Sequence, residues 1–381
     1  MNNRQPDYSL PQGTCADAVN GDFDNMGRFA RRQGYEKVTA LAGGHSAKAT
    51  SQGIFLVNGF ELCRWTPNGL EALAQVSGEP MHFVEHNDTV FWTDGVDTGR
   101  IVDGVVKRWG IDAPEDTFLL TTSDRTSHPG DVTVALTYVR DDGVESGLSP
   151  AKQITSSPDA TVTVTSLPLT GDPDVAQINV YAGRGETLYL ESTVAAGATA
   201  TSFTLTGAGR PAEQRRLDPP PAGNGLALFR GRVYITVGSY LIYSDPFRPE
   251  HFDLAGGFIP FEHDIEIVAP VEAGIYVAAG GTMFLRGTDP DQFQIDQILH
   301  YGAVPGTAVD IPNTSGVMWM STLGAVMGDA SGNAQNVQEQ NVAVGVSNTL
   351  GDGAAMIRER RGLRQFVAVS PAATNRFARA R

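Results

Sequence analysis

A recurring strand–turn–strand pattern is the feature that most constrains how this chain can fold. Short runs of alternating apolar and polar residues are separated by Gly, Asn and Asp. Apolar residues seldom recur at the three-to-four-residue spacing of an amphipathic helix. Turn dipeptides such as Asn58-Gly59, Asn87-Asp88, Gly280-Gly281 and Arg361-Gly362 can adopt the positive φ of tight hairpins. The pattern predicts an all-β chain. Six units resemble one another: GIFLVNGFELCRW from Gly53, MHFVEHNDTVFWTDG from Met81, LALFRGRVYITVGSYLIYSD from Leu226, PVEAGIYVAAGGTMFLRG from Pro270, GVMWMSTLGAVMGD from Gly316 and AAMIRERRGLRQFVAV from Ala354.

The spacing of these units indicates a repeat architecture. From Leu226 onward they begin about 38 to 46 residues apart, which is the period of four-stranded propeller blades. One such blade cannot bury both of its faces, so the blades must repeat around an axis. We expect a β-propeller-like domain of about six blades, with five or seven as alternatives. Residues Lys37 to Ala42 are expected to complete the last blade, because closure removes exposed edges.

The interval from Met81 to Leu226 holds about one blade period and a further hundred residues. This excess contains clean alternating strands, and four side chains of one strand share a face: Val132, Val134, Leu136 and Tyr138. Short strands of this kind indicate an immunoglobulin-type sandwich. The segments TYVRDDGVESGLSP and INVYAGRGE resemble a fibronectin type III domain, although the usual tryptophan of the early strand is missing. The expected organisation is a first propeller part over 1–115, an inserted sandwich over 116–217 and a second propeller part over 218–381.

Composition narrows the classes of partner. Lys and Arg number 28 against 43 Asp and Glu, giving a net charge of −15. Wrapping duplex DNA depends on phosphate neutralisation by basic residues, whereas an acidic channel could pass DNA without holding it. Cys15 and Cys63 are the only cysteines, which excludes a disulfide framework and a multi-cysteine zinc site. The polar start and the lack of long apolar runs predict a soluble protein made in a cytoplasm, without membrane insertion.

The stretch DFDNMGRFARRQGY, residues 22–35, could suit a cation or a phosphate. Asp22, Asp24 and Asn25 supply oxygen atoms, but an EF-type loop needs Glu at its twelfth position, which here is Gln33. GRFARRQG also lacks the GK[ST] ending of a phosphate loop. The preferred interpretation is a hairpin that opens the first blade.

Other chemistry-bearing motifs have structural alternatives that we favour. His82 to His86 reads H-x-x-E-H, yet that zinc motif needs a helix and its neighbours alternate like a strand. FEHDIEI, residues 261–267, could supply the carboxylate pair of a glycosidase but is better read as a solvated loop. The tryptophans are expected to pack between blades, with a sugar platform as the alternative; they are Trp65, Trp92, Trp109 and Trp319. We therefore expect no catalytic, cofactor-binding or metal-binding residue and no enzyme activity.

Both ends of the chain carry a resemblance to a known group. The N-terminal pattern and the C-terminal unit AAMIRERRGLRQFVAVSP are similar to propeller-type structural proteins of tailed bacteriophages, the tail hub or nozzle proteins that include the packaged-DNA stabilisation group. The N-terminal pattern consists of Asn20, Asp22, Asp24, Gly27, Arg32, Gly34 and Tyr35. This resemblance implies a non-enzymatic virion component in a ring of copies, a hexamer, that contacts other tail proteins or fibres and lets DNA pass without specific binding.

The residues expected at interfaces lie at two hairpin tips and in the basic tail. They are Asp141, Asp142 and Gly143, then Arg184, Gly185 and Glu186, and finally Arg376, Arg379 and Arg381. A carbohydrate-binding or glycan-cleaving propeller acting in adsorption is the alternative function. It requires Glu262, Asp264 and Glu85 to converge at the propeller axis beside a tryptophan. A cellular assembly scaffold is disfavoured, because the units lack the G-H and W-D signature of WD40 blades.

Overall fold

The computed structural model describes residues 9–10, 15, 21–23, 28–31, 36–213, 216–340, 352–360 and 362–369, and these ranges contain strands but no α-helix. A single-turn 3-10 helix, η2 (Pro290–Gln292), lies between two strands. None of the helical segments in these ranges is long and apolar enough to cross a bilayer. The expected all-β class is confirmed.

The described residues contain five antiparallel meanders, and in each the first four strands lie side by side in sequence order. This arrangement is consistent with a propeller-like β fold. The first sheet contains β3 (Gly44–Thr50), β4 (Gly53–Asn58), β5 (Glu61–Thr66) and β6 (Gly69–Gln75). The second contains β7 (His82–His86), β8 (Thr89–Thr93), β9 (Thr98–Val102) and β10 (Val105–Lys107). The third contains β18 (Leu226–Phe229), β19 (Arg232–Val237), β20 (Tyr240–Asp245), β21 (Arg248–Phe252) and β22 (Phe258–Pro260), which also pairs with β20. The fourth contains β23 (Ile267–Val271), β24 (Gly274–Ala279), β25 (Gly281–Arg286) and β26 (Gln294–Leu299), and the fifth contains β27 (Val309–Asp310), β28 (Val317–Ser321), β29 (Gly324–Gly328) and β30 (Ala334–Asn336).

The predicted turn chemistry explains the register of these meanders. Asn87 and Asp88 both have positive φ, 49° and 60°, and join β7 to β8 with His86 opposite Thr89. Two consecutive left-handed residues give the two-residue hairpin whose twist matches that of the strands. Gly59 and Gly280 adopt φ of 66° and 71° between β4 and β5 and between β24 and β25.

Consecutive sheets pack face to face, and alternation along each strand supplies a core to both sides. In the second sheet Val90 belongs to the core shared with the first sheet, while the next residue, Phe91, belongs to the core shared with the third. In the fourth sheet Ile275 packs towards the third sheet and Tyr276 towards the fifth. The first strands of neighbouring sheets also contact one another, β3 with β7, β7 with β18 and β18 with β23. Burial of both faces explains why a central strand such as β24 reads as a nearly continuous apolar run.

Two hairpins stand outside the five meanders. β31 (Ala354–Arg360) pairs with β32 (Leu363–Val369), and β1 (Gly21–Phe23) pairs with β2 (Phe29–Arg31). The expectation that Lys37 to Ala42 form a closing strand is wrong, since none of these residues lies in a strand. The end of that segment is tied to the β4–β5 turn instead: the Ala42 N–H donates to Asn58 Oδ1 at 2.9 Å.

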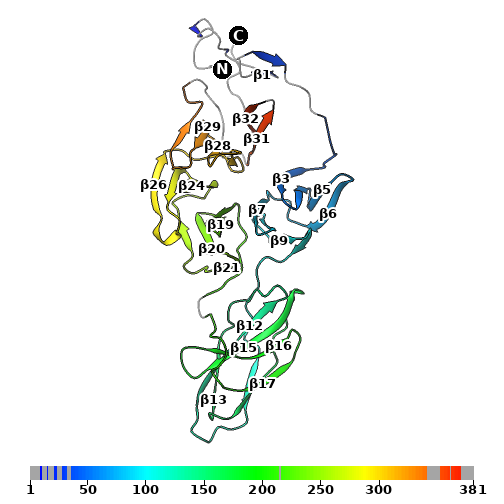
Figure 1. The fold of residues 1–381 in the computed structure, drawn as a ribbon, viewed down its shortest axis with the longest axis vertical. Coiled ribbons are helices and arrows are strands. Elements are labelled where there is room, and N and C mark those ends of the chain that lie inside the picture. Colours follow the sequence, from blue (N-terminus) through cyan, green and yellow to red (C-terminus); the bar gives the residue numbers. More distant parts are fainter. Residues whose placement is uncertain are drawn as a thin grey trace.

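Residues 116–217 contain two further sheets, here called the two-sheet region. One sheet has the order β11-β14-β17 and the other β13-β12-β15-β16. The two share one core to which the predicted face of Val132, Val134, Leu136 and Tyr138 contributes, as expected. In Figure 1 this region lies at one end of an elongated molecule, opposite β1, β31 and β32. The strands are β11 (Leu119–Thr122), β12 (Gly130–Arg140), β13 (Lys152–Ser156), β14 (Thr161–Thr165), β15 (Val175–Gly183), β16 (Tyr189–Ala195) and β17 (Ala200–Thr204).

Candidate functional site

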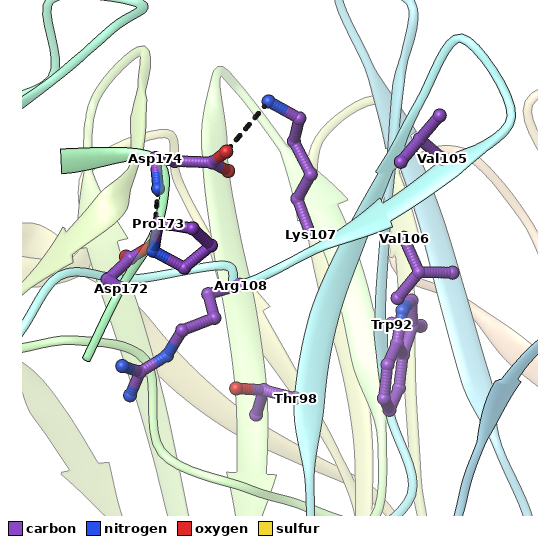
Figure 2. A pocket seen from close by; sticks show the side chains of 9 residues that line it. All are labelled: Trp92, Thr98, Val105, Val106, Lys107, Arg108, Asp172, Pro173 and Asp174. Carbon is purple, nitrogen blue, oxygen red and sulfur yellow. Dashed lines mark hydrogen bonds and ion pairs between the residues drawn. The ribbon is translucent and has the colours of Figure 1, made fainter. Parts of the chain in front are cut away.

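Two concave surfaces involve the two-sheet region. The first, which we call the junction cleft, has a volume of about 470 Å3 and lies where the loop Asp172–Asp174 faces the outer strands of the second sheet. Figure 2 shows Lys107 reaching across it to Asp174, with Trp92 on the other side. The second, the distal cleft, measures about 450 Å3 and lies at the β15–β16 hairpin. Its lining residues are Ala182, Gly183, Arg184, Gly185, Glu186, Thr187, Tyr189, Leu205, Thr206 and Gly207.

Two arginines and one aspartate form the centre of the junction. Arg100, on β9, places Nη1 2.9 Å from Asp142 Oδ2, and its side chain is 7% exposed. Arg140, at the end of β12, has a fully buried side chain and places Nη2 3.1 Å from the same oxygen. Arg140 Nη1 also donates to the Trp109 carbonyl at 2.9 Å. Charges from the second sheet and from the two-sheet region thus meet on one carboxylate.

Further charges extend this group, which we call the junction network. Lys107 Nζ lies 3.2 Å from Asp174 Oδ1 and 3.9 Å from Asp141 Oδ2. Glu250, on β21 of the third sheet, lies 3.8 Å from Arg140 and is 13% exposed. The network therefore joins the two-sheet region to two neighbouring sheets. Opposite charges this close interact far more strongly when removed from water than at an exposed surface.

The pKa shifts follow from burial and from these partners. Burial alone would raise the pKa of Asp142, but a hydrogen bond from the Val144 N–H and the guanidinium groups of Arg140 and Arg100 hold it below its usual range. Burial raises the pKa of Glu250, and its arginine neighbours only partly oppose that effect. Desolvation outweighs attraction where the charged form lacks close donors. Asp142 thus keeps its negative charge to a lower pH than a free aspartate, whereas burial makes the charged form of Glu250 costly.

His251 adds a polar contact beside the network. Its Nε2 lies 2.7 Å from the Glu145 carbonyl oxygen, and its buried Nδ1 has no partner in the residues that the structure covers. Burial and the nearby Arg248 lower the pKa of His251. The imidazole is therefore neutral near pH 7, and Nε2 carries the proton that it donates.

The first predicted interface tip, Asp141-Asp142-Gly143, lies at the junction and not at an outward tip. The Asp142 carboxylate is occupied by Arg100 and Arg140, whereas the Asp141 side chain is 58% exposed. A Cβ added at Gly143 would meet no atom within 4 Å. A role for these residues in contacts with another molecule stays a prediction, and the geometry assigns Asp142 an intramolecular one.

The second predicted tip lines the distal cleft. Arg184 donates to the Gly130 carbonyl at 2.7 Å and to the Ser157 carbonyl at 2.9 Å, so its exposed side chain is held in place. Gly185 has open space around it, and Glu186 lines the same cleft. Their role at an interface stays a prediction. Arg376, Arg379 and Arg381 lie outside the described residues.

The other chemistry-bearing motifs are dispersed. His82 and His86 lie on the strand β7, as expected, and no group of three or more His, Cys, Asp or Glu in the described ranges could hold a metal ion. Glu85 accepts a hydrogen bond from the Ser51 N–H at 3.1 Å. Three of the tryptophans lie in cores between sheets, namely Trp92, Trp109 and Trp319.

Sequence reasoning missed the junction arginines. Arg100 lies directly before Ile101 and Val102 in β9, and Arg140 ends the long alternating strand β12. A charge placed inside or directly beside an apolar strand is a signal for a buried ion pair. Asp142 lies two residues after Arg140, but its pairing with Arg100 and the approach of Glu250 to Arg140 join segments that are far apart along the chain, so the sequence does not reveal them.

Comparisons with known proteins do not identify a family. No family model matches the chain, and no curated protein matches it. Among solved structures, the N-terminal part of BBS1 in complex with ARL6 is similar at a TM-score of 0.33 and 10% identity, covering 87% of this chain and 90% of that one. The computationally designed protein Ika8 has a TM-score of 0.26 at 10% identity, covering 83% and 92%. The extracellular domain of BT3049 from B. thetaiotaomicron, a putative hybrid two component system, also has a TM-score of 0.26 and 10% identity, covering 85% and 55%.

Proposed function

We propose that this protein is a structural component of a bacteriophage tail, a nozzle-type or hub-type ring protein of the virion. In this proposal residues 1–115 and 218–381 form a propeller of six blades, and residues 116–217 are an inserted sandwich like fibronectin type III. Five meanders with a core between each consecutive pair support the first part. The shared core of the two-sheet region supports the second.

The junction network is the observation that carries the structural role. A module on a flexible linker samples many orientations, whereas Arg100, Arg140 and Asp142 fix this one with a buried, charge-assisted contact. A fixed outward module can set the angle at which a neighbouring protein attaches. The net charge of −15 fits a channel wall that DNA passes without binding.

The proposed contacts with neighbours involve the distal cleft. Arg184 is pre-positioned by two carbonyl oxygens, which lowers the entropy lost when it meets a partner. Gly185 and Gly207 leave backbone accessible beside it. We expect tail proteins or fibres to dock there, and copies of the chain to contact one another laterally as a closed ring.

The test is the mass distribution of the full chain, measured by mass photometry alone and after mixing with purified virion or tail fractions. A ring of six copies of the 40.6 kDa chain in either sample is the expected result. The double variant Arg184→Ala, Glu186→Ala should keep the ring and lose attachment to the fraction, with Asp131→Ala at the same end of the two-sheet region as the matched control. A chain that stays monomeric in both samples contradicts the proposal.

Glycan binding is a second candidate function, favoured by one observation at the junction cleft. Trp92 Nε1 and Asp172 Oδ2 are buried polar atoms without a partner in the described structure, and both residues line this cleft. A buried donor and a buried acceptor at the wall of one cleft suit a hydroxyl-bearing ligand. Host-surface polysaccharide should then bind the full chain in calorimetry, and Asp172→Asn should weaken binding. Equal heats for Asp172→Asn and wild type would contradict it.

A further inference from the structure

We propose that β1 and β2 are the third and fourth strands of a sixth sheet, and that β1 pairs with the edge of β32 left open in the described structure. The inference rests on the wheel arrangement of the proposed function and is independent of the virion role. Its first basis is that β32 pairs only with β31 among the described strands, while each of the five meanders has at least four strands. An open edge of this length invites pairing with another strand.

β31 occupies the place of a first strand. It contacts β27, the first strand of the fifth sheet, as β18 contacts β23. The hairpin also carries apolar side chains on both faces: Ile357 lies opposite Phe366 on one face, and Met356 opposite Val367 on the other. Strands buried on both faces have this pattern, whereas a strand with one wet face alternates. Met356 is nevertheless 56% exposed, so this face of the hairpin is less buried than its apolar pattern predicts.

The two sheets at the ends of the series each present an apolar face towards this position. In the fifth sheet, Met318 lies opposite Met327 on the face turned away from the core shared with the fourth sheet, and both are half-buried. In the first sheet, Ile54 lies opposite Trp65 on the face turned away from the second sheet, and Ile54 is 38% exposed. A complete sixth sheet between them would cover both faces, whereas the two strands β31 and β32 alone would not.

Chain order decides which strands are missing. In each meander the chain runs from the first strand to the fourth. It then enters the first strand of the next sheet, except that the two-sheet region intervenes after β10 and β22 intervenes after β21. β31 and β32 supply the first two strands of the sixth sheet, so the strands that precede β3, namely β1 and β2, must supply the third and fourth. Residues 32–43 would form the connection to β3, spanning at most about 40 Å. Residues 76–81 and 300–308 likewise connect the fourth strand of one sheet to the first strand of the next.

The length of β2 agrees with a fourth position, whereas β1, with three residues, is shorter than the third strands of the five meanders, which have five or six. β2 has three residues, as do the fourth strands β10 and β30. β1 and β32 lie at the same end of the molecule in Figure 1. The occupant is the hairpin of the same chain, because the short connection to β3 keeps it at high effective concentration beside its own β32. Exchange with a second copy is the competing outcome.

A disulfide scan on the full chain tests the pairing. Asp22→Cys, in a Cys15→Ser background, is combined one at a time with Arg364→Cys, Gln365→Cys, Phe366→Cys and Val367→Cys. Cys63 stays, because it is 2% exposed and burial raises its pKa. Paired strands bring Cα atoms within the 4.4 to 6.8 Å, roughly, that a disulfide needs. We expect one or two of these pairs to close within a monomer on mild oxidation, and Asp22→Cys with Asp131→Cys to remain open.

If none of the four pairs forms a disulfide, the proposal is overturned. Disulfides that form only between chains overturn it in favour of strand exchange. Hydrogen exchange gives a second readout that does not depend on the cysteines. In the full chain, the alternate amides of β32 that β31 leaves unpaired should exchange slowly, and removing residues 1–31 should accelerate them on the order of tenfold or more. Equal exchange in the two proteins contradicts the pairing. Neither experiment measures the mass of the oligomer. A monomeric result in the mass photometry test of the proposed function would therefore leave this inference intact.

Discussion

Removing the buried guanidinium of Arg140 tests whether the junction network holds the two-sheet region in place. Its side chain is fully buried and bonds Asp142 through Nε at 3.2 Å and Nη2 at 3.1 Å, and it donates to the Trp109 carbonyl at 2.9 Å. Arg140→Met keeps much of the side-chain volume but removes these hydrogen bonds and one of the two cations beside Asp142. Breaking a buried ion pair costs about 3–5 kcal/mol. Because Asp142 keeps Arg100 and is 33% exposed, we expect the lower end of this range, about 3 kcal/mol.

The assay is urea unfolding of the full chain at pH 7, followed by tryptophan fluorescence and circular dichroism. Arg108→Met is the matched control, because Arg108 pairs with Asp112 at 3.0 Å and both side chains are more than half exposed. That control should lose no more than about 1 kcal/mol. If Arg140→Met is no more destabilising than Arg108→Met, the network does not clamp the region and the reasoning behind the fixed orientation is refuted.

Three further predictions concern the pH dependence of stability and the packing between sheets. Because burial raises the pKa of Glu250 above 4.5, this group destabilises the folded state as the pH rises from about 4.5 through its folded pKa; Glu250→Gln should flatten that part of a stability–pH profile, and an unchanged profile would count against the assignment. The pKa of Asp142 is lowered, so the stability it contributes above pH 3.8 should be lost as the pH falls through its folded pKa, and Asp142→Asn should remove that acid-side loss in the same titration. Trp319→Ala, in the core between the fourth and fifth sheets, should cost about 3–5 kcal/mol in urea unfolding, and a loss below about 1 kcal/mol would contradict the inter-sheet packing.

Local pattern was enough to predict the strands, the hairpin turns and the apolar face of β12. These features depend on alternation and on residues such as Asn87 that accept positive φ, and both can be read along a few residues. The closing segment was placed wrongly at Lys37 to Ala42, because apolar residues there look like a strand. Whether a segment pairs depends on a neighbour's open edge, and the sequence does not display that edge. The Asn58 side chain binds the Ala42 N–H instead.

The candidate site was harder to predict because its charges come from separate elements. Asp141 and Asp142 read as an exposed tip, since turns rich in Asp and Gly usually lie in water. Only the fold reveals that Arg100 and Arg140 face this turn and that Glu250 reaches it from the third sheet. A buried cation seldom occurs without a partner, so a sequence reader can predict that a partner exists but cannot name it.

The two-sheet region lies at a connection between two meanders, so it interrupts neither sheet. It lies between β10, the fourth strand of the second sheet, and β18, the first strand of the third, where the chain passes from one sheet to the next. Packing between those sheets uses Phe91, Val233 and Phe252, none of which belongs to the region. Its own core is likewise built from its own residues, apart from Ile111. Since neither core needs the other, their relative orientation depends on the contacts between them, and the junction network is the buried, charge-assisted set among those contacts. Substitutions in the distal cleft can therefore change its surface without changing the packing between the meanders.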